Sequence, residues 1–274
     1  MSRPAHHPIT PAQRELDRAI RAAILADGRI EYALAYGSFT QDTADAFSDL
    51  EYYVFVAPAD LPTFDVRAWL EAVASVRHFF LKDFGTPNAV MDGLVRVELH
   101  AEADTALAQV EGWPNWHMDP AAMLVKDRDG RLAAHLAALA AKDRPQPQAE
   151  AQAIYDRLLG WLVFGSGVLE RGERVRALEL LGWVRGGLLR LARLAEGQTK
   201  HWLTPSRRAE WELEEATLER YARLTGRLDE LETLYAEAWA WTGELTQRLP
   251  ALRGADPALA RELSDRLGAA QQRR

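Results

Sequence analysis

The sequence contains no cysteine, no long hydrophobic run and no excess of basic residues. Without cysteine it can form no disulfide, thiolate nucleophile or cysteine metal site, which fits a reducing compartment. No run of about 18 apolar residues could span a bilayer, and the first residues lack an apolar signal segment. The formal net charge is −7, so no global basic field would hold a nucleic-acid backbone. We therefore expect a cytoplasmic protein with neither a membrane nor a nucleic acid as partner.

The composition of the chain changes near residue 143. The 274 residues are 48% hydrophobic, enough for a substantial core. The stretch DRPQPQAEAQ, residues 143–152, has two prolines among polar residues and is typical of a linker. It predicts a first domain over residues 1–142 and a second over 150–274. The fold class is predicted to be α+β, with a mixed sheet first and an all-helical bundle after it.

Local signals place the elements of the first domain. Thr10, Pro11 and Gln13 form an N-cap, a proline at the first helical position and a capping box, which predicts a helix that ends at Asp27-Gly28. A second helix is predicted over 67–76. Extended segments are predicted from alternation and turn residues at 30–36, 50–56, 78–84, 94–99 and 123–126.

The second domain is rich in Ala, Leu, Glu and Arg, and its apolar positions recur every three or four residues. This spacing predicts a bundle of about five helices. Their predicted ranges are 151–169, 174–194, 205–224, 228–249 and 257–270.

The segment YGSFTQDTADAFSDLEYYVFV, residues 36–56, carries two acids in or beside a predicted strand. Residues two apart in a strand point the same way, so Asp49 and Glu51 would lie on one face, ~7 Å apart. Like charges held this close favour a cation between them, and carboxylate oxygens suit Mg²⁺. Taken alone, such a pair is more often the solvated face of an edge strand.

Two further features favour a metal site. Gly37-Ser38 directly follows a predicted strand, where a tight turn, free backbone N–H groups and a hydroxyl could hold phosphate oxygens. Glu98 alternates with Arg96 and His100 on one face of another predicted strand. On an adjacent strand, Glu98 would complete a three-carboxylate cluster able to hold two Mg²⁺ ions, or act as base beside them. Singly, Gly-Ser is an ordinary turn and Glu98 an exposed strand acid.

The ordered set of Gly37, Ser38, Asp49, Glu51 and Glu98 resembles the nucleotidyltransferase superfamily related to DNA polymerase β. With FGTPNAVMDGLVRVELH, residues 84–100, and VLERGERVRALELL, residues 168–181, the chain looks like the lincosamide nucleotidyltransferases over residues 15–250. The match is weaker in the helical half.

The resemblance implies that AMP, or another nucleoside monophosphate, moves from ATP or another NTP to a drug hydroxyl, with pyrophosphate released. Carried over, Asp49 and Glu51 would be metal ligands, Gly37 and Ser38 would hold the triphosphate, and Glu98 would be the general base and a possible metal ligand. The second domain would bind the acceptor and close the cleft. A lincosamide is the expected acceptor.

The alternatives are an aminoglycoside, another small-molecule or protein hydroxyl, or a non-catalytic nucleotide-binding module. His100 could contact the acceptor or the metals, although a lone histidine is more often structural. Arg176 is a candidate phosphate contact, against a solvated Glu-Arg surface. The nine tryptophans favour core or interface packing. A homodimer is a further expectation from the apolar residues of the bundle.

Overall fold

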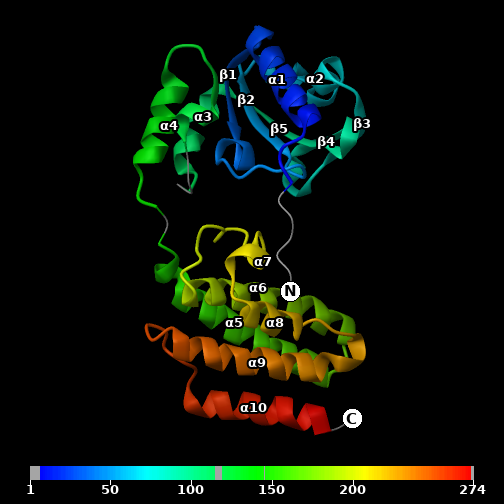
Figure 1. Ribbon diagram of the computed structural model, residues 1–274, viewed down its shortest axis with the longest axis vertical. Coiled ribbons are helices and arrows are strands. Elements are labelled where there is room, and N and C mark those ends of the chain that lie inside the picture. Colours follow the sequence, from blue (N-terminus) through cyan, green and yellow to red (C-terminus); the bar gives the residue numbers. More distant parts are fainter. Residues whose placement is uncertain (1–6, 115–118, 145, 273–274) are drawn as a thin grey trace. The chain divides into compact units, whose positions relative to one another are not determined.

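The computed structural model describes residues 7–114, 119–144 and 146–272 and divides into two compact units. Of the described residues, those from 7 to 144 form one unit and those from 146 to 272 form the other. Each unit is described by itself below (Figure 1). The predicted fold class, a mixed sheet with helices followed by a helical region, is confirmed.

The first unit is built on a six-stranded mixed sheet in the order β3-β4-β5-β2-β1-β6. Only the central pair, β2 and β5, is parallel, and the other neighbours are antiparallel. The strands are β1 (Ile30–Tyr36), β2 (Leu50–Val56), β3 (Val76–Leu81), β4 (Pro87–Met91), β5 (Arg96–Ala103) and β6 (Leu124–Asp127). Thus β1 and β2 match their predicted ranges, β3, β5 and β6 are offset by a few residues, and β4 was not predicted.

The helices of this unit are α1 (Pro11–Ala26), α2 (Val66–Val73), α3 (Pro120–Met123) and α4 (Arg131–Ala141), with 3₁₀ turns η1 (Gly37–Thr40), η2 (Leu61–Thr63), η3 (Asp83–Gly85), η4 (Asp92–Leu94) and η5 (Asp104–Gly112). The predicted capping box of α1 is confirmed, because Thr10 Oγ1 accepts from Gln13 N–H and Gln13 Oε1 accepts from Thr10 N–H. Helix α2 ends at Val73, three residues early, because the chain is extended at Ala74 and enters β3. Helix α4 was not predicted.

Side chains alternate along the central strands, so each sheet face has its own core. Along β2, Leu50, Tyr52 and Val54 face a core that includes residues of α1 and α2. On the opposite face Phe55 packs into a second core with α4 and η5. Because Glu51 is four residues before Phe55, it lies on this second face, toward the start of β2.

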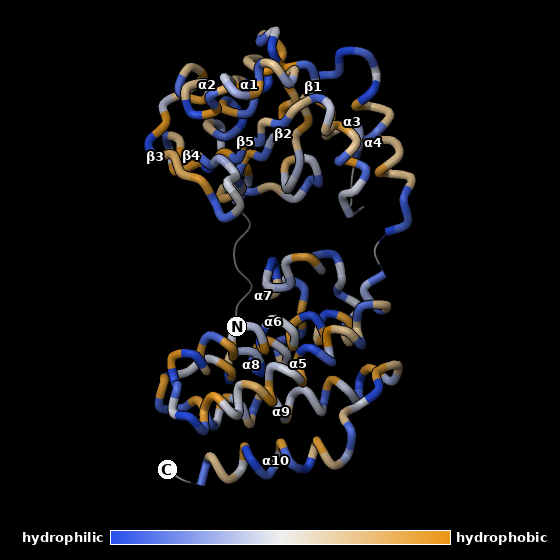
Figure 2. Tube along the Cα trace, turned by 180° about the vertical axis from the view of Figure 1, so that it is seen from behind, coloured by the Kyte–Doolittle hydropathy of each residue, from blue (hydrophilic) through white to orange (hydrophobic). Residues whose placement is uncertain are grey.

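The second unit is helical, as predicted, and hydrophobic and hydrophilic residues alternate along its helices (Figure 2). Its helices are α5 (Pro147–Glu170), α6 (Arg174–Ala195), α7 (Ala209–Glu212), α8 (Glu215–Ala222), α9 (Leu231–Arg248) and α10 (Pro257–Gln272), with the 3₁₀ turn η6 (Leu228–Glu230). Helix α5 begins at Pro147, and a proline is tolerated in the first turn of a helix. The segment predicted as a ten-residue linker therefore contains the start of this helix, and the linker is shorter than predicted.

The helix predicted over 205–224 is wrong as a single element. Arg193 of α6 is fully buried, and its guanidinium donates to the carbonyls of Gln198, Pro205 and Arg207 and to the Glu212 carboxylate. These contacts hold residues 198–207 in turns that a straight helix could not follow. Helical structure starts at Ala209, after left-handed backbone at Arg208, and is broken again before α8.

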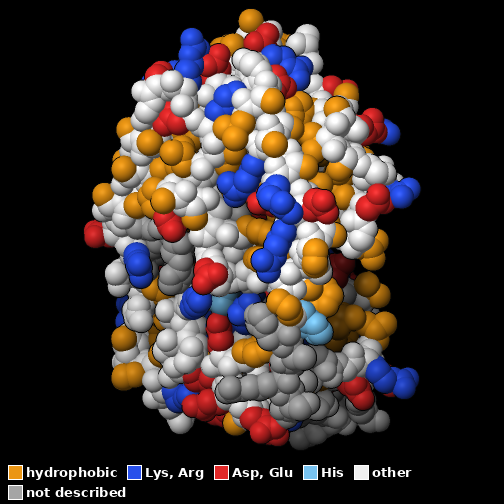
Figure 3. All heavy atoms as spheres, turned by 45° about the horizontal axis from the view of Figure 1, so that its top comes forward, with side chains coloured by type: hydrophobic (Ala, Val, Ile, Leu, Met, Phe, Trp, Pro, Cys, Tyr) orange, Lys and Arg blue, Asp and Glu red, His pale blue; other side chains and the backbone are white. Residues whose placement is uncertain are grey.

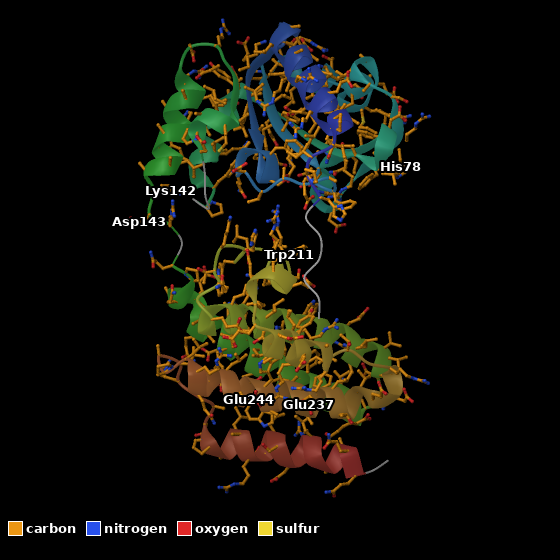
Figure 4. The ribbon with its side chains drawn as sticks, viewed as in Figure 1. His78, Lys142, Asp143, Trp211, Glu237 and Glu244 are labelled. Carbon is orange, nitrogen blue, oxygen red and sulfur yellow. The ribbon has the colours of Figure 1, made fainter. Side chains whose placement is uncertain are left out.

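Ion pairs also join α8 to α9. Arg220 of α8 donates to Glu237 at 2.8 Å and contacts Glu244, both on α9 and both labelled in Figure 4. Charged side chains of both signs are scattered over the face that Figure 3 presents. Among the residues described, no helix combines the length and the apolar character that a bilayer span requires.

Candidate active site

A row of polar side chains crosses four strands on the second face of the sheet. Tyr36 of β1 is paired with Glu51 of β2, Glu51 with Glu98 of β5, and Glu98 with Asn88 of β4. Directly paired residues in a sheet lie on the same face, with their side chains within reach of each other. The row of Tyr36, Glu51, Glu98 and Asn88, called the acid row here, therefore brings two of the three predicted acids together.

Glu98 of the acid row contacts four polar side chains. It is 9% exposed, and Tyr36 donates its hydroxyl to Glu98 Oε1 at 2.7 Å. His100 Nε2 lies 2.9 Å from the same oxygen, while Lys82 forms an ion pair with Oε2. Asn88 Nδ2 also approaches Oε2, at 3.4 Å. These four partners fix the orientation of the carboxylate.

The same contacts set the charge of Glu98. Burial raises the pKa of this carboxyl, but the hydrogen bonds from Lys82, Tyr36 and His100 outweigh burial and lower the pKa to about 2. Burial, and then the bond to Glu98, raise the pKa of the Tyr36 hydroxyl well above its ordinary value. At neutral pH the pair is thus an ionised acid accepting from a protonated phenol.

Asp49 precedes β2 by one residue and does not lie inside the strand. Its Oδ2 pairs with Arg96 Nη2 at 2.5 Å, next to the neighbouring pair of Leu50 and Val97. The prediction that Arg96, Glu98 and His100 share a face agrees with this arrangement, because Arg96 reaches Asp49 while Glu98 is paired with Glu51.

Two features require a glycine at position 37: its backbone conformation and the close approach of Glu51. Its φ is +74°, and a Cβ built on it would lie 1.6 Å from Glu51 Oε2. Only glycine allows the Glu51 carboxylate to lie against the chain at this turn. Ser38 follows, 3% exposed, and its Oγ has no hydrogen-bond partner among the described residues. A buried hydroxyl without a partner suits a polar ligand such as a phosphate oxygen.

The acids fit Mg²⁺ in the type of donor that they offer, since Glu51 and Glu98 present carboxylates on paired strands. In the parts of the chain that the structure describes, however, no three His, Asp or Glu side chains form a group that could hold a metal ion. Arg96 and Lys82 already neutralise Asp49 and Glu98. The predicted three-carboxylate cluster would form only if these two cations moved.

Aromatic side chains border the acid row. The rings of His100 and Tyr53 are stacked with centroids 4.0 Å apart and planes 5° from parallel. Tyr53 also contacts Tyr36 at 5.5 Å and Trp113 at 5.0 Å. His100, predicted as a substrate contact, is therefore engaged on one side by Glu98 and on the other by Tyr53.

Sequence reasoning missed Lys82, Asn88, Tyr36 and Tyr53. Tyr36 and Tyr53 could have been found from the sequence, because each lies in a predicted strand. Residues at an even spacing in a strand share a face, as Tyr53 does with Glu51. Lys82 and Asn88 gave no such signal, since they depend on β4, whose existence and register were not predicted.

Arg176 lies in the helical unit, on α6. It contacts Glu173 at 3.3 Å, and its guanidinium lies 5.2 Å from the centroid of the Phe164 ring. The alternative to a phosphate contact, a local pair of Glu and Arg at the surface, is thus present. The phosphate role of Arg176 stays a prediction.

Residues 148–252 match the family described as "Lincosamide nucleotidyltransferase-like, C-terminal domain". The match lies within the helical unit and covers less than half of the chain. It agrees with the family and the class of enzyme predicted from the sequence, a nucleotidyltransferase.

Other comparisons are more distant. No curated protein matches the chain. Among solved structures, an aminoglycoside 6-adenyltransferase from Bacillus subtilis aligns at 13% identity over 96% of this chain and 99% of that one, with a TM-score of 0.42. A nucleotidyltransferase-like protein from Exiguobacterium sibiricum 255-15 aligns at 16% identity over 93% and 88%, with a TM-score of 0.38. Both TM-scores are below 0.5, so neither likeness carries weight here.

Proposed function

We propose that this nucleotidyltransferase moves a nucleoside monophosphate, AMP first among the candidates, from an NTP to a hydroxyl of an antibiotic, with a lincosamide as the first acceptor to test. The observation that carries the proposal is the pairing of Glu51 with Glu98 beside the glycine turn at Gly37. The family of the helical unit supports the choice of acceptor.

Within this proposal each residue has a distinct task. Glu98 accepts the proton of the attacking hydroxyl or would hold Mg²⁺, and at neutral pH it is ionised, as both roles require. Asp49 and Glu51 would hold Mg²⁺, and the ion would neutralise charge at the phosphates when bound. Gly37 and Ser38 receive the triphosphate, because Ser38 Oγ is a buried donor with no partner in the described residues.

The test is to incubate the protein with Mg²⁺, each NTP in turn, and a panel of lincosamides and aminoglycosides, and to measure product mass. We expect a lincosamide to gain one nucleoside monophosphate. The Glu98→Gln variant should react about 10²- to 10⁴-fold more slowly, which is the range of rate enhancement that a general base contributes. Glu102→Gln is the matched control, because Glu102 lies on the same strand four residues further along. It should keep wild-type activity.

The acceptor panel also separates the alternatives. Transfer to an aminoglycoside alone would replace the lincosamide and keep the chemistry. Metal-dependent NTP binding without transfer to any acceptor would contradict the antibiotic-modifying proposal.

A further inference from the structure

A groove lies between α5 and α6 of the helical unit, and none of its lining residues belongs to the acid row. It has a volume of about 320 Å³, and its floor includes Ile154 and Leu158 of α5. Both helices contribute one face each, at residues spaced three, four or seven apart along α5. The remaining residues that line it are two arginines, two tryptophans and three glycines.

The glycines keep the groove open. Gly182 and Gly186 lie inside α6, where glycine destabilises a helix relative to alanine. A Cβ added at either position would meet nothing within 4 Å, so close packing does not require glycine there. By contrast, a Cβ at Gly187 would contact Leu158 at 3.5 Å. Larger side chains at Gly182 and Gly186 would occupy the groove, which gives these two glycines a reason other than packing.

The two arginines of the groove are unpaired within the described residues. No hydrogen bond or ion pair holds Arg157 or Arg190 there. Arg174, Arg193 and Arg220 of the same unit each have a carboxylate partner. In a chain whose net charge is −7, two unpaired guanidiniums on one groove form a local site for an anion.

The two tryptophans supply a flat apolar wall. The rings of Trp161 and Trp183 are 4.6 Å apart at an angle of 58°. Trp183 is 57% exposed, an unusually large exposure for a residue of this size. An aromatic ring bound between α5 and α6 would cover apolar surface that water now contacts.

We infer that this groove is a binding site for a flat aromatic ring that carries a strongly acidic group. The ring packs against Trp161 and Trp183, and the acidic group accepts hydrogen bonds from Arg157 and Arg190. Two sources share this chemistry, a nucleoside phosphate and a non-nucleotide aromatic acid. No residue of the acid row takes part in this site.

The probe is 8-anilino-1-naphthalenesulfonate, a sulfonate on a flat naphthalene ring, whose fluorescence rises in an apolar site. We expect saturable binding at one site per chain to the folded protein. The double variant Arg157→Gln/Arg190→Gln should weaken it at least about tenfold, since charge-assisted hydrogen bonds are lost. Gly186→Leu should abolish binding by filling the groove and should not lower the melting temperature. Gly160→Leu is the matched control, because Gly160 is a helical glycine with open space outside the groove.

Competition identifies the source. Displacement of the probe by AMP assigns a nucleoside phosphate, and displacement by 1-naphthoate but not AMP assigns an aromatic acid. Unchanged affinity in both groove variants would overturn the inference. Equal displacement by inorganic phosphate would also overturn it, because the ring would then be unnecessary. A concentration-dependent dimer that Gly186→Leu dissociates would mean that a second copy of the chain occupies the groove.

Discussion

The contact between Gly37 and Glu51 allows a single added methyl group to test the acid row. In Gly37→Ala the new Cβ would lie 1.6 Å from Glu51 Oε2, whereas real Cβ atoms keep at least 3.0 Å. The carboxylate would therefore have to retreat by about 1.4 Å. A displacement of about 1 Å costs about 10²-fold in rate when the moved group positions reactants. Left-handed backbone at alanine also costs about 1–2 kcal/mol of stability.

We expect Gly37→Ala to lower kcat in the nucleotidyl-transfer assay by about 10²-fold, with a modest loss of thermal stability. The matched control is Gly130→Ala, because Gly130 has φ +87° and open space around the added Cβ. It carries the same backbone cost without moving an acid. If both variants lose equal activity, stability alone explains the result, and if Gly37→Ala stays fully active, the Glu51 position does not matter.

Three more variants test the charges described above. Lys82→Met should tighten Mg²⁺ binding by about tenfold or more, measured by calorimetry, because the substitution removes the cation that is paired with Glu98. An unchanged affinity would contradict the idea that Lys82 and Mg²⁺ compete for Glu98. The low pKa of Glu98 means that its stabilising effect is present above about pH 4.5 and lost toward about pH 2. The excess stability of wild type over Glu98→Gln in urea unfolding should therefore shrink by about 2 kcal/mol between about pH 5.5 and about pH 3; a constant difference would contradict the lowered pKa. Arg193→Met should destabilise the helical unit by about 3–5 kcal/mol, and the control Arg227→Gln, at an exposed pair, by under about 1 kcal/mol. Similar melting temperatures for these last two would contradict the role of Arg193.

Local signals explain which parts of the fold were predictable. The capping box at Thr10 and the alternation along β1 and β2 act within a few residues, so these elements matched closely. The helix predicted over 205–224 failed because the apolar spacing is local, whereas the buried guanidinium of Arg193 acts from another helix. Segment 87–91 is a strand because it pairs with both β3 and β5.

In the candidate site, too, local features could be predicted from the sequence, whereas contacts between strands could not. Alternation predicted the strand faces of Glu51 and Glu98, but their direct pairing depends on the parallel register of β2 and β5. The partners of Glu98 could not, because Lys82 reaches it through the register of β3, β4 and β5. Asp49 lies just before β2, and its contact with Arg96 depends on the parallel register of β2 and β5.

The parallel pairing of β2 with β5 has an evolutionary consequence. Parallel neighbours need a crossover, and residues 57–95 provide it here, carrying α2, β3 and β4. The acids sit on the two strands that this excursion joins, while Lys82 and Asn88 sit on the excursion itself. Substitutions between Val56 and Arg96 can thus retune the charge around Glu98 while the acids keep their places. Relatives could diverge in metal demand or pH response through this one segment.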